Sequence, residues 1–375
     1  MIELAEKPYP GTRFKPQTGR VKFIDRVSPG LSLECNVQQK LTLLCAPAGY
    51  GKTVLMSQWR EKLSDETSYS LWLNLKSGDR APSSLLNSLV ACVSQALGPG
   101  LEDRCRSFET PEDVISFLAN VMEAADRPII WFWDNYECVQ GSESVALLVE
   151  LIDAIPTKVK LVVSSRMMPE WNHVDFYLQD DVKIINQAEL GFSLTEIKHY
   201  FEADGWEELN ENQIYKLASC VEGWPAIVKL AAIGLQNASS PGEVKQVLTG
   251  EYQLISQFLL KHLLLDLGDE LLEFVHQTSH LNGLRADLCN FVCDIKDSEV
   301  RMQALVERGL LNEHKYFERV YSYPRFISAY LKRNFETTLG ERADELRTRA
   351  VDWYIESNNP SESLYHALFL PDISC

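Results

Sequence analysis

The chain has 375 residues, of which 45% are hydrophobic and 24% are charged, a composition typical of two or three packed globular units. The formal net charge of -17, from 36 basic and 53 acidic residues, argues against the chain as a whole gripping a nucleic-acid backbone. No apolar run reaches the roughly 18 residues of a membrane span, and residues 1–16 lack the apolar core of a signal peptide. We therefore expect a cytoplasmic protein whose nine cysteines are reduced thiols.

Strand and helix signals alternate through the first half of the chain. Short apolar runs predict strands at 41–45, 69–75, 129–133 and 159–164. Helical patterns lie between them at 53–63, 83–97, 111–125 and 144–155. This alternation predicts a parallel sheet with crossover helices, and the near-continuous apolar strands predict that both faces of the sheet are covered.

After about residue 188 the strand signals nearly stop. A helix is predicted from Ser193, because Glu196 three residues later completes a capping box, and helical patterns continue to about Gln236. Later helices are predicted near 252–265, 268–279, 285–293, 299–308 and 341–369, the last broken at 358–360. Two short strand signals at 310–313 and 317–323 follow the helices near 252–308. Several helices that end in such a small hairpin predict a winged-helix unit.

A phosphate-binding loop is predicted after the first strand, with the sequence Ala46-Pro47-Ala48-Gly49-Tyr50-Gly51-Lys52-Thr53 and Val54 behind it. Because a strand delivers the loop and a helix leaves it, backbone N–H groups can cradle phosphate oxygens. The glycines allow backbone conformations that a side chain would block. The lysine reaches the β- and γ-phosphates, and the threonine hydroxyl reaches Mg²⁺. The usual pattern begins with glycine where this loop has alanine.

Two later strands end in polar residues that fit the same chemistry. Asp134 follows the strand 129–133 and is predicted to hold the Mg²⁺ shell. Asn135 stands where hydrolytic enzymes often have a second acid, so it predicts either slow or absent hydrolysis or a simple capping role. Arg166 lies at the end of the segment that contains the strand 159–164. It is predicted either to contact the γ-phosphate or to pair with a surface acid.

Two metal-like spacings are present and are weaker signals. Cys289 and Cys293 lie four apart, as do His276 and His280. Neither pair has a CxxC partner or the glutamate of an HExxH motif, so we do not expect a metal at either.

Together these motifs resemble the STAND class of signalling ATPases, and most closely its MalT-like, LuxR-type transcription regulators. The resemblance runs from about residue 20 to 368. It is carried by the loop at 46–53 with Gln58-Trp59, WFWDNYE at 131–137, LVVSSR at 161–166, the segment 190–196 and Gly223-Trp224-Pro225.

The resemblance implies further nucleotide contacts. Arg26, in the segment Ile24-Asp25-Arg26, would help hold the base, and Pro225 would lie against the adenine. Asp79, at the end of the segment that begins at Leu73, would lie near the γ-phosphate. Lys52, Asp134, Asn135 and Arg166 would then act on the phosphates, and Thr53 and Asp134 would hold Mg²⁺.

The resemblance also implies an architecture and a mode of action. It predicts an α/β P-loop NTPase domain at 1–188, a helical domain at 189–250, a winged helix at 251–338 and the start of a superhelical arm at 339–375. ADP would hold a closed resting form, and ATP with an unknown inducer would favour an open form that self-associates. No LuxR-type helix-turn-helix is found before Cys375, so DNA would be bound only through a domain outside this chain, or not at all.

One departure concerns the winged helix. The family has a histidine there that touches the ADP β-phosphate, whereas this chain reads Ser-Tyr-Pro-Arg-Phe at 322–326. Tyr323 or Arg325 is a candidate to substitute for it, the alternative being that Arg325 is simply a solvated residue. With Asn135, this departure keeps two alternatives to a slow switch open: a turnover ATPase of the remodelling type, and a nucleotide-locked interaction module without hydrolysis.

Overall fold

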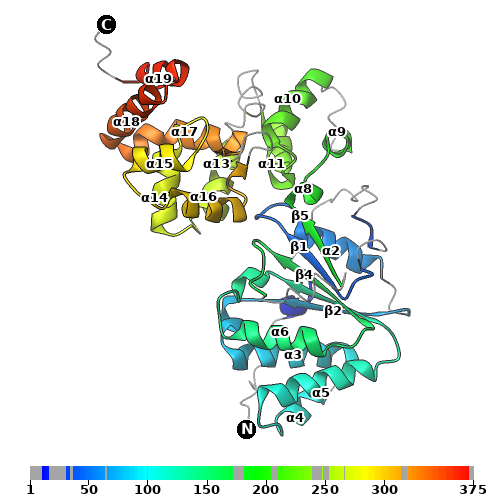
Figure 1. The fold of residues 1–375 in the computed structure, drawn as a ribbon. Coiled ribbons are helices and arrows are strands. Elements are labelled where there is room, and N and C mark those ends of the chain that lie inside the picture. Colours follow the sequence, from blue (N-terminus) through cyan, green and yellow to red (C-terminus); the bar gives the residue numbers. More distant parts are fainter. Residues whose placement is uncertain are drawn as a thin grey trace. The chain divides into compact units, whose positions relative to one another are not determined.

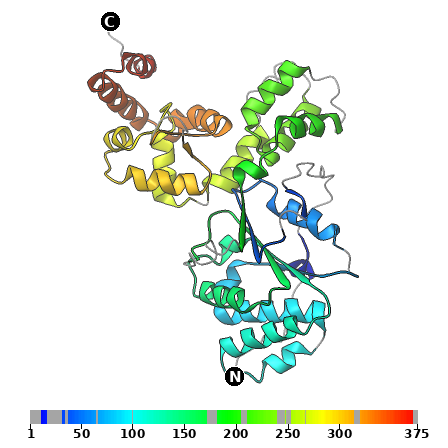
Figure 2. The same cartoon turned by 45° about the vertical axis from the view of Figure 1, so that its right-hand side comes forward.

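The chain divides into two compact units, residues 1–190 and 191–375, seen in the computed structural model of Figure 1 and, turned by 45°, in Figure 2. Each unit is described by itself. The structure describes residues 11–16, 31–33, 37–63, 66–98, 100–171, 181–203, 210–238, 247, 253–265, 267–313 and 319–370.

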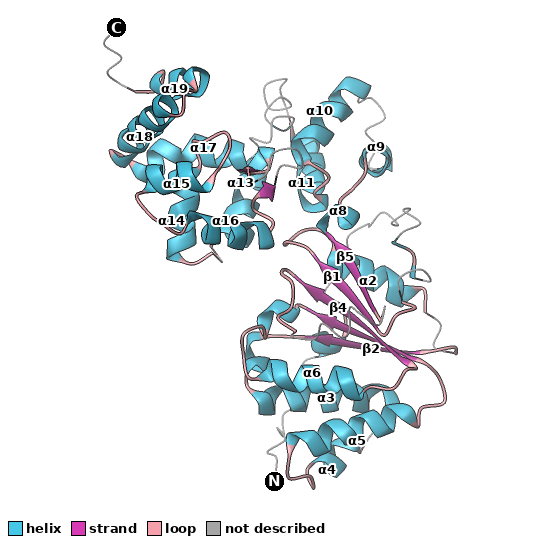
Figure 3. Ribbon diagram, viewed as in Figure 1, coloured by secondary structure: helices cyan, strands magenta, loops and turns pink. Residues whose placement is uncertain are grey.

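A parallel sheet forms the centre of the first unit (Figure 3). Within the described residues its strands are β1 (Leu41–Cys45), β2 (Tyr69–Asn74), β3 (Ile129–Asp134), β4 (Val159–Ser165) and β5 (Val182–Asn186). They lie in the order β2-β3-β4-β1-β5, and every neighbouring pair is parallel. The parallel sheet expected from the alternating signals is therefore confirmed, and all strands end at one edge.

Helices cover both faces of this sheet. They are α2 (Lys52–Glu61), α3 (Pro82–Leu97), α4 (Leu101–Cys105), α5 (Pro111–Glu123), α6 (Ser144–Ala154) and α8 (Gln187–Leu190), with single 3-10 turns η1 (Gly11–Phe14), η3 (Ser77–Arg80) and η4 (Tyr136–Cys138). Helices α3, α5 and α6 pack on one another over one face, and α2 lies against the other (Figures 1 and 2).

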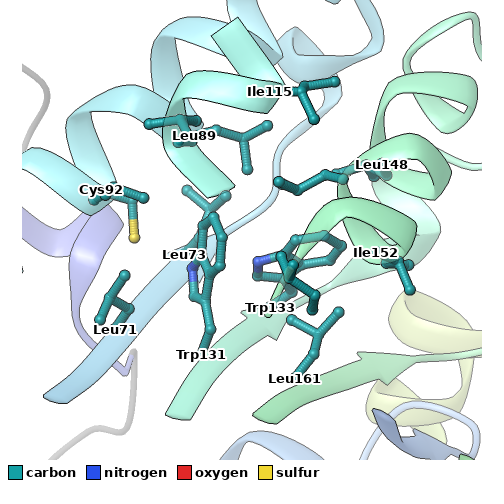
Figure 4. Packing of buried hydrophobic residues seen from close by; sticks show 14 of the residues in the cluster. Leu71, Leu73, Leu89, Cys92, Ile115, Trp131, Trp133, Leu148, Ile152 and Leu161 are labelled. Carbon is teal, nitrogen blue, oxygen red and sulfur yellow. The ribbon is translucent and has the colours of Figure 1, made fainter. Parts of the chain in front are cut away.

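The core explains why the strands are apolar at nearly every position. Successive residues of a strand point to opposite faces, so a sheet covered on both sides buries all of them. On the side of α3, α5 and α6, Trp131 and Trp133 pack edge to face among leucines such as Leu148 (Figure 4). On the other side, the rings of Trp72 and Phe132 stack with centroids 5.4 Å apart.

Strand β5 and helix α4 were not predicted. Strand β5 is an edge strand that pairs only with β1 among the described strands, and most of its residues are partly exposed. Its short, mixed sequence therefore has neither a long apolar run nor a clean alternation. Its position is decided by the free edge of β1, which is a tertiary feature.

The second unit begins with a helical region: α9 (Leu194–Ala203), α10 (Glu211–Val221) and α11 (Pro225–Asn237). The predicted capping box at the first of these is confirmed. Ser193 N donates to Glu196 Oε2 at 2.8 Å, and Glu196 N donates to Ser193 Oγ at 3.2 Å. A similar box, formed by Asn210 and Gln213, opens α10. These caps satisfy N–H groups that the first helical turn leaves without an acceptor.

The remaining described elements form a winged-helix arrangement followed by two helices. They are α13 (Gln253–Leu259) with the π-helical turn η5 (Leu260–Leu264), α14 (Asp269–Thr278), α15 (Ala286–Cys293), α16 (Ser298–Glu307), β6 (Asn312–Glu313), β7 (Tyr321–Ser322), α17 (Arg325–Leu339), α18 (Arg342–Glu356) and α19 (Pro360–Ala367). The two short strands pair antiparallel, as predicted; residues 317–318 of the second strand signal lie outside the described residues.

Helix α17 was not predicted, although the break between α18 and α19 was. The first turns of α17 carry aromatic and β-branched residues with weak helix propensity, and burial of Phe326 and Ile327 stabilises the helix instead. At the predicted break, Asn358 has a φ of 54° and the Asn359 side chain accepts from the N–H of Glu362. Among the described residues, no helix is long and apolar enough to cross a membrane.

A tight turn joins two of the sequence motifs in the second unit. Phe192 N donates to Gly223 O at 2.7 Å. Gly223 has a φ of +74°, and a Cβ built there would lie 2.7 Å from the backbone oxygen of Phe192. Because both the conformation and the space exclude a side chain, glycine is required between Glu222 and Trp224.

We therefore expect Gly223→Ala to destabilise the protein more than Gly268→Ala. Gly268 has nearly the same φ, +75°, but a Cβ there would meet nothing within 4 Å. The control should lose about 1–2 kcal/mol, the cost of a left-handed alanine. Gly223→Ala should lose a further amount of about 1–3 kcal/mol because of overpacking. Urea unfolding of both variants measures the difference, and equal losses would contradict the close approach.

Candidate functional site

The predicted phosphate loop lies at the carboxyl end of β1. It connects Cys45 to α2, and its glycines Gly49 and Gly51 have φ values of 83° and 81°. These left-handed conformations suit glycine, as the sequence indicated. No described side chain caps α2 at Gly51, so N–H groups of its first turn can bind an anion.

Lys52 folds back over this loop. Its Nζ donates to the carbonyl oxygens of Ala46 at 2.5 Å and Pro47 at 3.0 Å, and only 9% of the residue is exposed. Burial lowers the pKa of Lys52 to about 8, against the opposing effect of Glu137 and then Asp134. A cation held this way, next to a helix N-terminus that no described side chain caps, is suited to a phosphate.

Asp134 links three elements at the same edge. Its carboxylate oxygens accept from Thr53 Oγ1 on α2, at 3.0 and 2.9 Å, and from Ser164 Oγ on β4 at 2.5 Å. Burial raises the pKa of Asp134, and the hydrogen bonds from Ser164 and Thr53 oppose that rise. The threonine hydroxyl and the carboxylate supply hard oxygen ligands side by side, a donor set that fits Mg²⁺.

Asn135 makes a left-handed turn directly after β3. Its φ of 63° and ψ of 48° place it in a region that asparagine tolerates better than most residues, and its N–H donates to Ser164 Oγ at 3.0 Å. The residue occupies the N-cap position of η4, but its side chain forms no capping hydrogen bond there. Its effect on hydrolysis stays a prediction.

The turn brings Glu137, which sequence reasoning missed, against Arg166. Arg166 Nε lies 3.0 Å from Glu137 Oε1, and the N–H of Arg166 donates to Glu137 Oε2 at 3.3 Å. The Glu137 side chain is 14% exposed and that of Arg166 38% exposed. The sequence signal was an acid at the end of WFWDNYE, but only the left-handed turn shows where it points. Arg166 therefore pairs with an acid here; its contact with a γ-phosphate stays a prediction.

Asp79 is fully buried in a hydrogen-bond network. Its carboxylate forms an ion pair with Arg13 and accepts from Ser88 Oγ at 2.9 Å and from the N–H of Lys76 at 2.8 Å. These contacts tie η3 to α3 and to the N-terminal turn η1. Arg13 was not singled out because its sequence neighbourhood is polar and proline-rich. The expected role of Asp79 near the γ-phosphate stays a prediction.

The expected substitutes for the missing winged-helix histidine are both engaged inside the second unit. Tyr323 is buried, and its hydroxyl lies 2.7 Å from Thr278 Oγ1. Arg325 Nη1 donates to Ser219 Oγ at 2.5 Å, and its N–H donates to Glu222 Oε1 at 3.3 Å. Tyr323 thus points into the winged helix, and Arg325 holds the turn that precedes Trp224.

Pro225 and Arg26 are the two residues that the resemblance places near the base. Pro225 is the first residue of α11, in the second unit. Arg26 lies outside the described residues. In the described part of the chain, no group of three or more histidine, cysteine, aspartate or glutamate side chains is arranged to hold a metal ion.

The sheet and its loop place the first unit among P-loop NTPase folds, and a family model matches part of the second unit. The MalT winged helix domain family matches residues 260–343. Serine/threonine-protein kinase PknK of Mycobacterium tuberculosis (strain ATCC 25618 / H37Rv) is 25% identical over 373 residues, 97% of this chain and 33% of that protein. The HTH-type transcriptional regulator MalT of Cronobacter sakazakii is 23% identical over 343 residues, 89% of this chain and 38% of that protein.

Residues 260–343 thus match the MalT winged helix domain family, and the chain along most of its length is similar to MalT regulators. It spans about a third of the length of these curated relatives. Among solved structures, the Aeropyrum pernix ORC2 protein has a TM-score of 0.39 at 10% identity, covering 80% of this chain and 89% of that one. AMPPCP-bound DnaA from Aquifex aeolicus has a TM-score of 0.37 at 11% identity, covering 84% and 99%. Likenesses this weak define neither a ligand nor an assembly.

The lowered pKa of Lys52 predicts a pH-dependent stability. Because the folded state binds this proton less tightly than the unfolded state, the cost of burying the charge is fully present below pH 8. It is lost as the pH rises from about 8 towards 10.5. Relative to Lys52→Met, the wild type should therefore gain up to about 3 kcal/mol of unfolding free energy over that range.

Urea unfolding at pH 7, 8, 9 and 10 without nucleotide measures this difference. Lys62→Met, which removes the same charge from an exposed position, is the matched control. A wild-type-minus-Lys52→Met difference that stays flat from pH 7 to 10 would show that the ammonium is not desolvated.

The buried ion pair predicts a large loss from a single substitution. Arg13→Ala leaves the Asp79 carboxylate buried without its cation and should cost about 3–5 kcal/mol. Arg106→Ala breaks an exposed pair with Asp103 and should cost at most about 1 kcal/mol. Chemical denaturation of both variants tests the contrast, and similar small losses would mean that the Arg13 pair contributes little.

Proposed function

We propose that this chain is the nucleotide-binding switch of a MalT-like regulator, taking ATP or ADP with Mg²⁺ at the edge of its sheet. The observation that carries the proposal is the convergence of three features at one edge. These are the glycine loop with its uncapped helix, the buried ammonium of Lys52, and the contact between Thr53 and Asp134. Each suits a different part of a magnesium–phosphate group.

The residues of the site have separate roles in this proposal. Lys52 neutralises the β- and γ-phosphates, and Thr53 and Asp134 hold Mg²⁺, which when bound neutralises phosphate charge. Arg166 reports the terminal phosphate. Further contacts are proposed for the loop and beyond it: Pro47, Ala48, Gly49, Tyr50, Gly51, Val54, Arg26, Asp79 and Pro225.

Hydrolysis is proposed to be slow. Asn135 lacks a carboxylate to take a proton from water, and its left-handed turn directs the chain into η4. A site that binds tightly and turns over slowly can hold one state for long periods, which suits a signal rather than a motor.

The similarity to HTH-type transcriptional regulators supports a regulatory setting. We propose an ADP-bound resting form and self-association driven by ATP and an inducer, with helical, winged-helix and arm domains at 189–250, 251–338 and 339–375. DNA would be bound through a further domain, and the protein would act in the cytoplasm. Only ligands that bind the two forms with different affinity can move such a switch.

Thermal unfolding of the full chain with and without Mg-ATP or Mg-ADP tests the binding. The wild type should bind both, and ligand at 100 times its dissociation constant should add about 2.7 kcal/mol of stability. Lys52→Ala should abolish most of this, whereas Lys62→Ala, at an exposed site, should keep it. Absence of binding by the wild type contradicts the proposal.

Two further readings separate the alternatives. Phosphate release above about 1 s⁻¹ would point to a turnover ATPase of the remodelling type instead. An oligomeric state that is the same with ADP and with ATP would point to a nucleotide-locked interaction module.

A further inference from the structure

We propose that Glu137 is a specificity-determining residue that sets the preference for triphosphate over diphosphate, by holding Arg166 in a resting ion pair. The inference rests on the proposed function and assigns a role to a residue that the nucleotide motifs leave unused. It concerns a carboxylate that pairs with the cation proposed to contact the terminal phosphate.

Two contacts fix the Glu137 carboxylate. One oxygen meets the Arg166 side chain at 3.0 Å and the other accepts from the Arg166 backbone at 3.3 Å. The backbone bond ties Glu137 to the end of β4 even when the guanidinium moves. The Glu137 side chain is mostly buried while that of Arg166 is more exposed, so the arginine is the partner that a ligand reaches more easily.

The same carboxylate also acts electrostatically on Lys52 of the phosphate loop. Glu137 and Asp134 are the acids whose charges act on Lys52, and Glu137 acts more strongly. Two cations and two acids therefore gather at the sheet edge, so that their charges nearly cancel before a ligand arrives. A phosphate that enters this cluster gains from Lys52 and Arg166 but is repelled by Glu137.

The repulsion acts mainly on the third phosphate. A diphosphate held by the loop and Lys52 leaves the pair between Glu137 and Arg166 intact. A triphosphate is bound fully only when the Arg166 guanidinium exchanges the Glu137 carboxylate for a phosphate oxygen. The lost ion pair is a cost borne by the triphosphate alone, so Glu137 biases the resting protein towards the diphosphate.

Affinities of AMPPNP, a non-hydrolysable triphosphate, and of ADP for the full chain with Mg²⁺ test this. Glu137→Gln keeps the shape of the side chain and removes its charge; it should raise the preference for AMPPNP over ADP by roughly fivefold, the size of a partly exposed ion pair. Arg166→Gln should reduce that preference. The double variant should match Arg166→Gln, because Glu137 acts through the arginine.

Glu123→Gln, which removes an exposed acid at the end of α5, is the control for net charge and should leave the ratio unchanged. A Glu137→Gln ratio equal to that of the wild type overturns the inference, as does a variant whose two affinities fall together, the mark of a structural role. An unchanged ratio with abolished phosphate release would instead make Glu137 a water-orienting carboxylate. A wild type that binds neither nucleotide overturns the proposed function and this inference with it.

Discussion

The contact between Thr53 and Asp134 joins the elements on which the first unit depends. It connects the first turn of α2 to the end of β3, and Ser164 extends the connection to β4. The contact exists because the strands are parallel and in register, so that their carboxyl ends reach the same edge. The core of tryptophans and leucines beneath that edge holds the register, and the polar residues at the edge depend on it.

The site is built from charges that are stable only as a group. Lys52 is buried at a cost in stability; the charge of Arg166 adds to that cost, and the charges of Glu137 and Asp134 offset it. Removing one of these charged side chains would leave its partner uncompensated in a poorly solvated place. For the same reason, a ligand of opposite charge binds favourably when it compensates a buried charge. The pair of Arg13 and Asp79 obeys the same physics but is closed by Ser88, so it fastens η1 and η3 to α3.

In the second unit a corresponding constraint lies at Gly223. Phe192 closes over this glycine from one side, and Arg325 with Phe326 holds the neighbouring Glu222 and Trp224 from the other. The turn before α11 is therefore shared by the helical region and the winged helix. Packed groups of both regions therefore meet at the start of α11.

The sequence by itself determined the parts whose cause is local. Four strands of the sheet, the capping box at Ser193, the break before Pro360 and the glycine loop at 46–53 follow from apolar runs, caps and turn residues close together in the chain. Tertiary structure decided the rest. Strand β5 needed the free edge of β1, and helix α17 needed a core for Phe326. The pairs Arg13–Asp79 and Glu137–Arg166 join residues far apart in the chain. Whether such charges meet depends on strand register and on the left-handed turn at Asn135, and neither is written in the spacing of the residues.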